Sequence, residues 1–183
     1  MSRSAKFLIF FTLFALTAVL VFGILLPNKY ESKVTFTLPV NSGTAFRIFS
    51  QFENYPAWYL LSFDDKKHLS WVSGVDGTKD AVLHWETSRN GFQRGQTQIS
   101  LIKPLTTIEL ISQSSQRDNR FTKDHFKIEV LDHQNVEVKW KRELTLQFPY
   151  NIFYRLKEST DSIEKEHHKI KEQFFEFYPE LAE

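Results

Sequence analysis

Residues 34–58 carry the clearest structural pattern in the chain and read VTFTLPVNSGTAFRIFSQFENYPAW. The first five residues alternate apolar side chains with threonine, which is the period-two pattern of a strand with one buried face. Pro39 ends this strand, because proline has no backbone N–H to donate to a neighbouring strand. Residues 34–38 therefore predict a sheet strand with one face turned toward a core.

Two short helices are predicted directly after this strand. Asn41 or Ser42 can cap the first helix, in which apolar residues at steps of three and four form one stripe. Asn54 can cap the second helix, and Pro56 suits a position in its first turn. A strand followed by amphipathic helices predicts that helices cover one face of the sheet. The stripe of the first helix consists of Ala45, Ile48, Phe49 and Phe52.

The rest of the chain predicts six more strands and one long helix. Gly, Pro, Asn and Asp separate the strand-like segments, and the hairpin-length connections predict an antiparallel meander of seven strands in all. From about residue 151 to residue 177, apolar residues recur at steps of three and four, which predicts an amphipathic helix across the sheet. The six strand-like segments are residues 69–72, 81–87, 96–102, 107–113, 125–131 and 136–148.

Two segments resemble parts of a known family. Residues 52–58, FENYPAW, resemble a D-x-E-N-W-P-x-W segment, with Tyr55 where tryptophan is usual. Residues 81–104 resemble a stretch in which a strand ending W-E-G leads to G-x-G and then to a hydrophobic strand closed by proline. Both patterns are typical of the polyketide cyclase/dehydrase and lipid transport family of the START-like (SRPBCC) superfamily. The corresponding positions of the second stretch are Trp85, Glu86, Gly91, Gly95, Ile99 and Pro104, with Thr87 in place of the first glycine and with three residues, instead of one, between Gly91 and Gly95.

This resemblance spans about residues 30–177 and implies the α+β helix-grip fold, a curved seven-stranded antiparallel sheet around a long carboxy-terminal helix. It also implies a hydrophobic cavity between sheet and helix, which in many members accepts a lipid, a sterol or a polyketide. Some relatives are cyclases or hydrolases, others are carriers, and others bind proteins. The matching motifs are structural, so no catalytic residue is predicted from them.

A transmembrane anchor is predicted for residues 7–26, which read FLIFFTLFALTAVLVFGILL and contain no charge. A helix of that length spans about 30 Å, which matches the hydrocarbon core of a bilayer. A cleaved signal peptide usually has an apolar stretch of about 7–15 residues that ends in a small-x-small site, and this stretch does not end that way. Two basic residues precede the span, which favours a cytoplasmic tail at residues 1–6. We therefore expect a single-pass protein of the inner (cytoplasmic) membrane, with a linker at residues 27–29 and one domain at residues 30–183 on the periplasmic or extracytoplasmic side.

Composition argues against several functional classes. The formal net charge is +1, so no basic field is available for nucleic acid. The chain has no cysteine for a disulfide, a thiolate nucleophile or an iron–sulfur site. Glu164 with His168, and His84 with Glu86, could each supply two metal ligands, which is fewer than the three or four that zinc needs. No metal, no cofactor and no catalytic residue is therefore predicted.

Strand alternation predicts which side chains face the long helix. In segment 136–148 the inward positions are apolar except for Arg142, and His167 falls on the apolar stripe of the long helix. We expect Arg142 and His167 to form the polar end of a mostly apolar pocket. The alternatives are an arginine at the sheet rim and a hydrogen-bonded core histidine. The residues predicted to line the pocket are Trp71, Leu83, Trp85, Ile99, Leu101, Phe126, Ile128, Trp140, Arg142, Ile163, His167, Ile170 and Phe174.

Three functions stay open at this point. The first is a membrane-anchored domain that binds a hydrophobic or amphipathic, lipid-like small molecule beneath the long helix. The second is a non-enzymatic protein-interaction module whose cavity is filled by its own Phe and Trp side chains, and an exposed apolar patch would favour it. The third is a cyclase- or hydrolase-like enzyme that uses Arg142 and His167.

Overall fold

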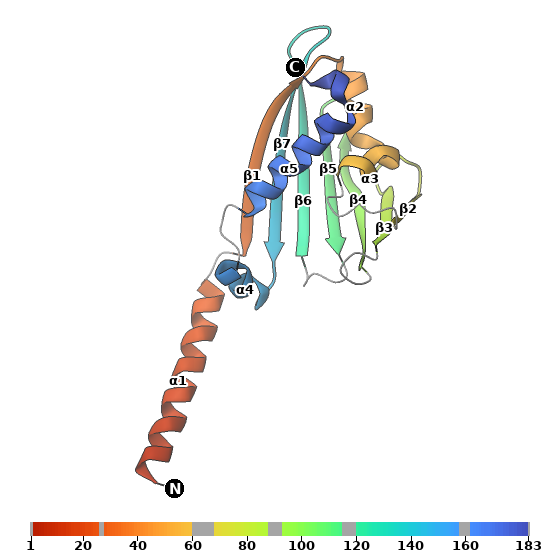
Figure 1. The fold of residues 1–183 in the computed structure, drawn as a ribbon. Helices are drawn as coiled ribbons and strands as arrows, with labels where there is room; N and C mark the ends of the chain where they lie inside the picture. Colours follow the sequence, from red (N-terminus) through yellow and green to blue (C-terminus); the bar gives the residue numbers. More distant parts are fainter. Residues whose placement is uncertain are drawn as a thin grey trace.

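The computed structural model describes residues 2–25, 28–59, 68–87, 93–114, 120–157 and 162–182. One long helix, α1, extends from one end of a domain that the sheet and the other helices form (Figure 1). In chain order the elements are α1 (Arg3–Leu25), β1 (Lys29–Leu38), α2 (Ser42–Ser50), η1 (Phe52–Asn54), α3 (Tyr55–Trp58), β2 (His68–Ser73), β3 (Val82–Thr87), β4 (Gln93–Lys103), β5 (Thr107–Ser114), β6 (Arg120–Val130), β7 (Val136–Leu146), α4 (Tyr150–Lys157), α5 (Ser162–Phe177) and η2 (Pro179–Leu181).

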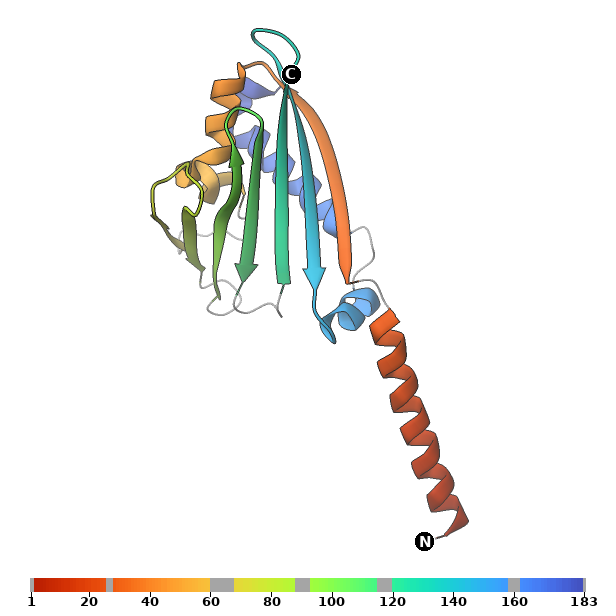
Figure 2. The same cartoon turned by 180° about the vertical axis from the view of Figure 1, so that it is seen from behind.

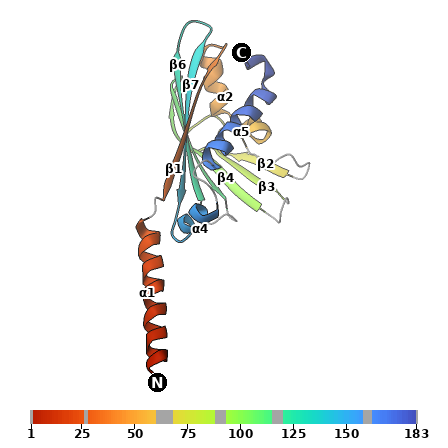
Figure 3. The same ribbon diagram turned by 60° about the vertical axis from the view of Figure 1, so that its left-hand side comes forward.

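The seven strands form one antiparallel sheet in the order β1-β7-β6-β5-β4-β3-β2. The sheet curves around α5, and β2, β3 and β4 bend toward the helices (Figure 3). Helices α2, α3 and α5 lie on this inner face, whereas the outer face carries no helix in the part of the chain that the structure describes (Figure 2). β1 begins and β7 ends next to α1, and we call this end of the sheet the anchor end (Figure 1). The architecture is the helix-grip fold that the sequence predicts.

Element boundaries follow local chemistry in some places and depart from the prediction in others. The Thr44 N–H donates a hydrogen bond to Asn41 Oδ1 at 2.9 Å, so Asn41 caps α2, as one of the two predicted caps. The prediction of one continuous helix over residues 151–177 was wrong, because α4 ends at Lys157 and α5 begins at Ser162. Ser, Thr and Asp, which favour helix caps over helix interiors, are concentrated in the sequence between them.

The prediction that Leu69 and Trp71 of β2 face the interior was wrong. Trp71 pairs with His84 on the outer face, where the indole stacks on the imidazole with 5.2 Å between ring centroids. Leu69 and Trp71 are 67% and 49% exposed, whereas Val72 packs against the core. This short edge strand has apolar residues in both phases of the alternation, so the pattern alone could not choose between the two faces.

A bulge in β4 overturns a second face prediction. The pairing with β5 shifts register between Ile99 and Leu101. An extra residue in one strand reverses the alternation beyond it, so Leu101 turns outward and Ile102 packs against the core instead. Leu101 therefore does not line the interior as predicted.

Aromatic rings fill the half of the interior that lies away from α1. Phe49 stacks on Phe126 and Phe174, with centroid distances of 4.8 and 5.4 Å, and Trp58 meets Phe174 edge-on at 5.1 Å. All four side chains are buried. Each such ring pair adds about 0.5–1.5 kcal/mol beyond the burial of its area. These contacts fix α2, α3 and α5 to the sheet and occupy the space between them.

Helix α1 is long and apolar enough to cross a membrane, with a mean hydropathy of 2.7 over its most apolar window. Most of its large apolar side chains are exposed, so the domain itself does not cover them. A helix whose large apolar side chains are mostly exposed in the described part of the chain is what a lipid environment can accommodate.

Candidate functional site

Buried polar side chains gather on the inner face of the sheet, in the half nearer the anchor end. Asp124 comes from β6, Arg142 from β7 and His167 from α5, and all three are buried. Charged side chains are seldom buried in proteins unless they are paired, so this group is the candidate functional site. We call it the polar cluster, and it consists of Ser32, Tyr59, Asp124, Arg142, Glu166 and His167.

Asp124 lies at the centre of the polar cluster. Its Oδ2 accepts a hydrogen bond from the Tyr59 hydroxyl at 2.6 Å, and its Oδ1 accepts one from Trp140 Nε1 at 2.6 Å. Burial raises the pKa of the Asp124 carboxyl, although the Arg142 charge and these two hydrogen bonds act in the opposite direction. Burial, followed by the charge of Asp124, also raises the pKa of Tyr59 well above its usual range, so this phenol stays a hydrogen-bond donor.

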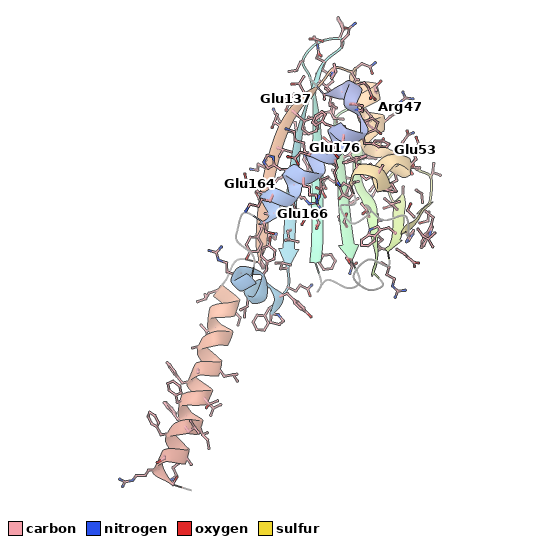
Figure 4. The ribbon with its side chains drawn as sticks, viewed as in Figure 1. Arg47, Glu53, Glu137, Glu164, Glu166 and Glu176 are labelled. Carbon is pink, nitrogen blue, oxygen red and sulfur yellow. The ribbon has the colours of Figure 1, made fainter. Side chains whose placement is uncertain are left out.

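Arg142 connects the carboxylate to the helix above it. Its Nη1 lies 3.7 Å from Asp124 Oδ1, and its Nη2 lies 3.3 Å from Oε1 of Glu166, which projects from the first half of α5 (Figure 4). Burial lowers the pKa of the guanidinium, but the nearby acidic groups outweigh this effect and raise it, so Arg142 is charged. Its buried Nη1 has no hydrogen-bond partner among the residues that the structure describes.

His167 faces Arg142 and Ser32 from α5. Its Nδ1 is 3.0 Å from Ser32 Oγ, and Ser32 is the cross-strand partner of Arg142. Burial, and then the charge of Arg142, lower the pKa of His167 to about 3, so the imidazole is neutral. Its Nε2 is buried and has no hydrogen-bond partner within the described ranges. The structure therefore brings the two predicted polar residues together, and their role in binding stays a prediction.

The strands next to the polar cluster present hydroxyl groups to the interior. Ser112 Oγ lies 3.1 Å from the Tyr59 hydroxyl and 2.9 Å from Thr97 Oγ1. Because the Tyr59 hydroxyl donates its hydrogen bond to Asp124, Ser112 donates to Tyr59 and Thr97 donates to Ser112. Such a directed chain leaves few alternative arrangements, which orients the Asp124 carboxylate.

Three partly buried side chains lie on the inner face beside the polar cluster. Trp85, Ser112 and Thr122 share the inward phase of their strands, and none of them is fully buried. Helix α5 crosses the inner face from β1 toward the far part of β5 (Figure 1). We call the patch of these three side chains the opening, and the hydrogen bond between Ser112 and Tyr59 joins it to the polar cluster.

The remaining predicted lining residues lie in several parts of the structure. Besides Trp140, six of them belong to the main hydrophobic core, and Ile163 belongs to a second buried cluster with Tyr30, Leu144, Leu146 and Tyr154. Trp85 lines the opening, and Trp140 joins the core to the polar cluster. Trp71 and Leu101 lie on the outer face, as described above. The six core residues are Leu83, Ile99, Phe126, Ile128, Ile170 and Phe174.

Four members of the polar cluster, Ser32, Tyr59, Asp124 and Glu166, were not predicted, and Asp124 and Tyr59 are the two that are hydrogen-bonded to each other. Asp124 occupies the inward phase of Phe126 in β6, but the predicted strand began one residue after it. A predicted strand that began before residue 124 would have included Asp124 as the one acidic residue among apolar inward positions. Such a residue marks a candidate site. Tyr59 follows α3 and belongs to no periodic pattern, so the sequence offered no signal for it.

Comparisons with known proteins support the fold. No protein-family model matches the chain, and no curated protein matches it in sequence. Norcoclaurine synthase from Thalictrum flavum, a point mutant in complex with a transition-state analogue, is similar in structure, with a TM-score of 0.53 and 10% identity over 82% of this chain and 96% of that chain. Another structure of the same enzyme has a TM-score of 0.53 and 10% identity over 81% of this chain and 87% of that chain. Zhui aromatase/cyclase from a Streptomyces species has a TM-score of 0.49 and 9% identity over 65% of this chain and 69% of that chain. At such identities the likeness concerns the fold alone, which is the predicted helix-grip fold, and the particular family stays a prediction.

Proposed function

We propose that this chain is a membrane-anchored helix-grip domain that binds an amphipathic, lipid-like molecule, with an acidic or hydrogen-bond-accepting head group at Arg142 and His167. The apolar part of the guest lies along Trp85 in the opening, because aromatic rings already occupy the other half of the interior. A START-like family membership and a placement on the periplasmic side belong to the same proposal.

One observation carries this proposal. Two buried nitrogens of the polar cluster, Arg142 Nη1 and His167 Nε2, have no hydrogen-bond partner in the described part of the chain, and Nη1 lies 3.7 Å from Asp124 Oδ1. A buried polar group without a partner costs about 1–3 kcal/mol, so a group that hydrogen-bonds to these atoms is favoured. Arg142 Nη1 needs an acceptor, whereas His167 Nε2 takes an acceptor or a donor according to which ring nitrogen carries the proton. A guanidinium suits carboxylate and phosphate groups, because its N–H donors match the spacing of their oxygens. The site is therefore suited to the polar end of a fatty acid or a phospholipid.

The position of α1 relative to the domain also supports a membrane-derived guest. α1 joins the domain at the same end of the sheet as the opening. A tether raises the effective concentration of a binding site near its ligand. A guest drawn from the bilayer would then enter from the end of the domain that faces the membrane.

The test is binding of a fluorescent fatty acid to the full chain in lipid nanodiscs, with Arg142→Met compared against Lys139→Met. Lys139 lies on the outer face of the same strand, β7, and its partners are Glu129 and Glu137. Loss of a charge-assisted hydrogen bond removes about 1.5–3 kcal/mol, so Arg142→Met is expected to weaken binding about 10- to 100-fold. Lys139→Met is expected to bind as the unmodified chain does. Equal affinity in all three folded proteins, or no binding at all, would overturn the proposal.

A second function is favoured by a separate observation. The outer face carries exposed apolar side chains at Leu69, Trp71 and Ile111, next to a hollow of about 380 Å³ that Trp71 and His84 line. Together with the ring-filled half of the interior, this patch fits a protein-interaction module. Trp71→Ser would then release a partner that cross-linking captures in membranes, whereas Arg142→Met would retain that partner.

A further inference from the structure

Helix α4 packs against the last turn of α1. Asn151 Nδ2 donates a hydrogen bond to the carbonyl oxygen of Gly23 at 2.8 Å, and both residues are buried. Gly23 is among the last four residues of α1, whose carbonyl groups have no N–H partner inside the helix. Asn151 therefore satisfies a carbonyl that would otherwise be unpaired next to an apolar span.

The contact depends on the absence of a side chain at Gly23. A Cβ at this position would overlap the Ile152 side chain and lie 2.9 Å from Phe148 Cε2. Real Cβ atoms do not approach other atoms so closely, so a side chain at residue 23 would have to displace the Ile152 and Phe148 side chains of the α4 region.

The other side of α4 is attached to the sheet. The Tyr154 ring lies against the Tyr30 ring of β1, with 4.8 Å between centroids. The Leu146 N–H at the end of β7 donates to the Asn28 carbonyl at 2.8 Å. α4 thus holds α1 and the sheet together, and we call this contact region the joint.

The surface of the joint has the composition of a membrane interface. Phe148 is 46% exposed, Tyr150 and Ile152 are partly exposed, and Arg155 and Lys29 are exposed. Aromatic side chains with basic neighbours, close to the end of an apolar span, are typical of the head-group layer of a bilayer. Basic residues at that depth also favour anionic lipids.

We infer that α4 lies in the lipid head-group layer of the bilayer that α1 crosses, and that the joint holds the anchor end of the sheet, with its opening, against the membrane surface. This inference rests on the proposed membrane anchor and adds an orientation to it. The occupant of the exposed α4 surface is the head-group layer, because that surface continues directly from the end of α1.

The chain has no cysteine, so single cysteines can carry spin labels. Gln147→Cys places a label next to α4, and Gln134→Cys places a matched label at the opposite end of the sheet. The collision rate of each spin label with membrane-dissolved oxygen and with an aqueous nickel chelate is measured in nanodiscs of phosphatidylcholine with phosphatidylglycerol. The ratio of the oxygen collision rate to the nickel collision rate is expected to be several-fold higher at residue 147 than at residue 134. Equal ratios, with the chain retained in membranes after alkaline carbonate extraction, would overturn the inference and leave the anchor intact.

A second pair of variants tests the joint itself. Gly23→Leu is expected to lower the ratio of the residue 147 label toward that of residue 134, because the added side chain separates α4 from α1. Ala18→Leu, an exposed position of the same helix, is expected to leave the ratio unchanged. An unchanged ratio in Gly23→Leu would contradict the claim that the contact of α4 with α1 holds the anchor end of the sheet at the membrane. Release of the unmodified chain by carbonate would overturn both the inference and the proposed anchor, whereas a failure to bind fatty acid would affect only the proposed function.

Discussion

Replacement of Asp124 by alanine tests the arrangement of the polar cluster. Asp124→Ala removes the acceptor of two hydrogen bonds, from Tyr59 and Trp140, and the acidic neighbour of buried Arg142. Removing one partner of a buried ion pair costs about 3–5 kcal/mol, because it leaves a buried charge uncompensated. Domains of this size usually have about 5–15 kcal/mol of unfolding free energy, so the variant would be close to unfolding.

The assay is urea unfolding of the full chain in detergent micelles, followed by tryptophan fluorescence. Asp124→Asn is combined with Arg142→Met in a double-mutant cycle, and the double variant is expected to lose less stability than the sum of the two single variants. Contacting residues couple by about 0.5–3 kcal/mol, and a value in the upper half of this range is expected here. Glu129→Gln on the outer face is the control and is expected to leave the unfolding midpoint unchanged, because exposed ion pairs contribute little. A loss below about 1 kcal/mol for Asp124→Ala, or additive single variants, would refute the reasoning.

Three further predictions concern the interior. The pKa of His167 is about 3 in the folded chain, against 6.5 for an ordinary histidine, so the unfolded chain binds the extra proton and stability falls as the pH drops from 6.5 toward 3. The free energy of unfolding changes by at most about 1.4 kcal/mol per pH unit through this group. Urea titrations at several pH values should show that His167→Gln removes this pH dependence. Phe174→Ala opens a cavity between stacked rings and is expected to cost about 3–5 kcal/mol in the same assay, whereas a cost near zero would mean that the rings do not fill this space. Gly95→Ala places a Cβ against the Trp85 ring and 2.6 Å from the Gln113 carbonyl oxygen, so a loss of about 1–3 kcal/mol is expected from thermal melts, and an unchanged melting temperature would contradict the packing described for the opening.

The sequence was sufficient for the fold because its signals repeat along the chain. The seven strand-like segments, the Asn41 cap and the apolar stripe of α5 are each local patterns, and each has a counterpart in the structure. The failures occurred where a local pattern is ambiguous. β2 has apolar residues in both phases, and the shift after Ile99 in β4 changes the phase without changing the composition.

The site was only partly predictable for a different reason. Arg142 and His167 stand out as polar residues in apolar series, which strand and helix periodicity reveal. Tyr59 joins them through tertiary contact alone, since it lies 65 positions from its hydrogen-bond partner Asp124. The contact of Gly23 with α4 is likewise invisible in the sequence, because the α1 pattern gives no reason to expect a partner there.

Mapping of a photoreactive guest tests the central claim most directly. A fatty acid with a diazirine close to its carboxylate would be irradiated with the full chain in nanodiscs, and the modified residues would be identified by mass spectrometry. Cross-links are expected on the inner face beside the polar cluster, at Trp85, Ser112 and Thr122, and they should disappear in Arg142→Met. Cross-links confined to α1 or to the outer face around Trp71 would contradict a guest-binding interior.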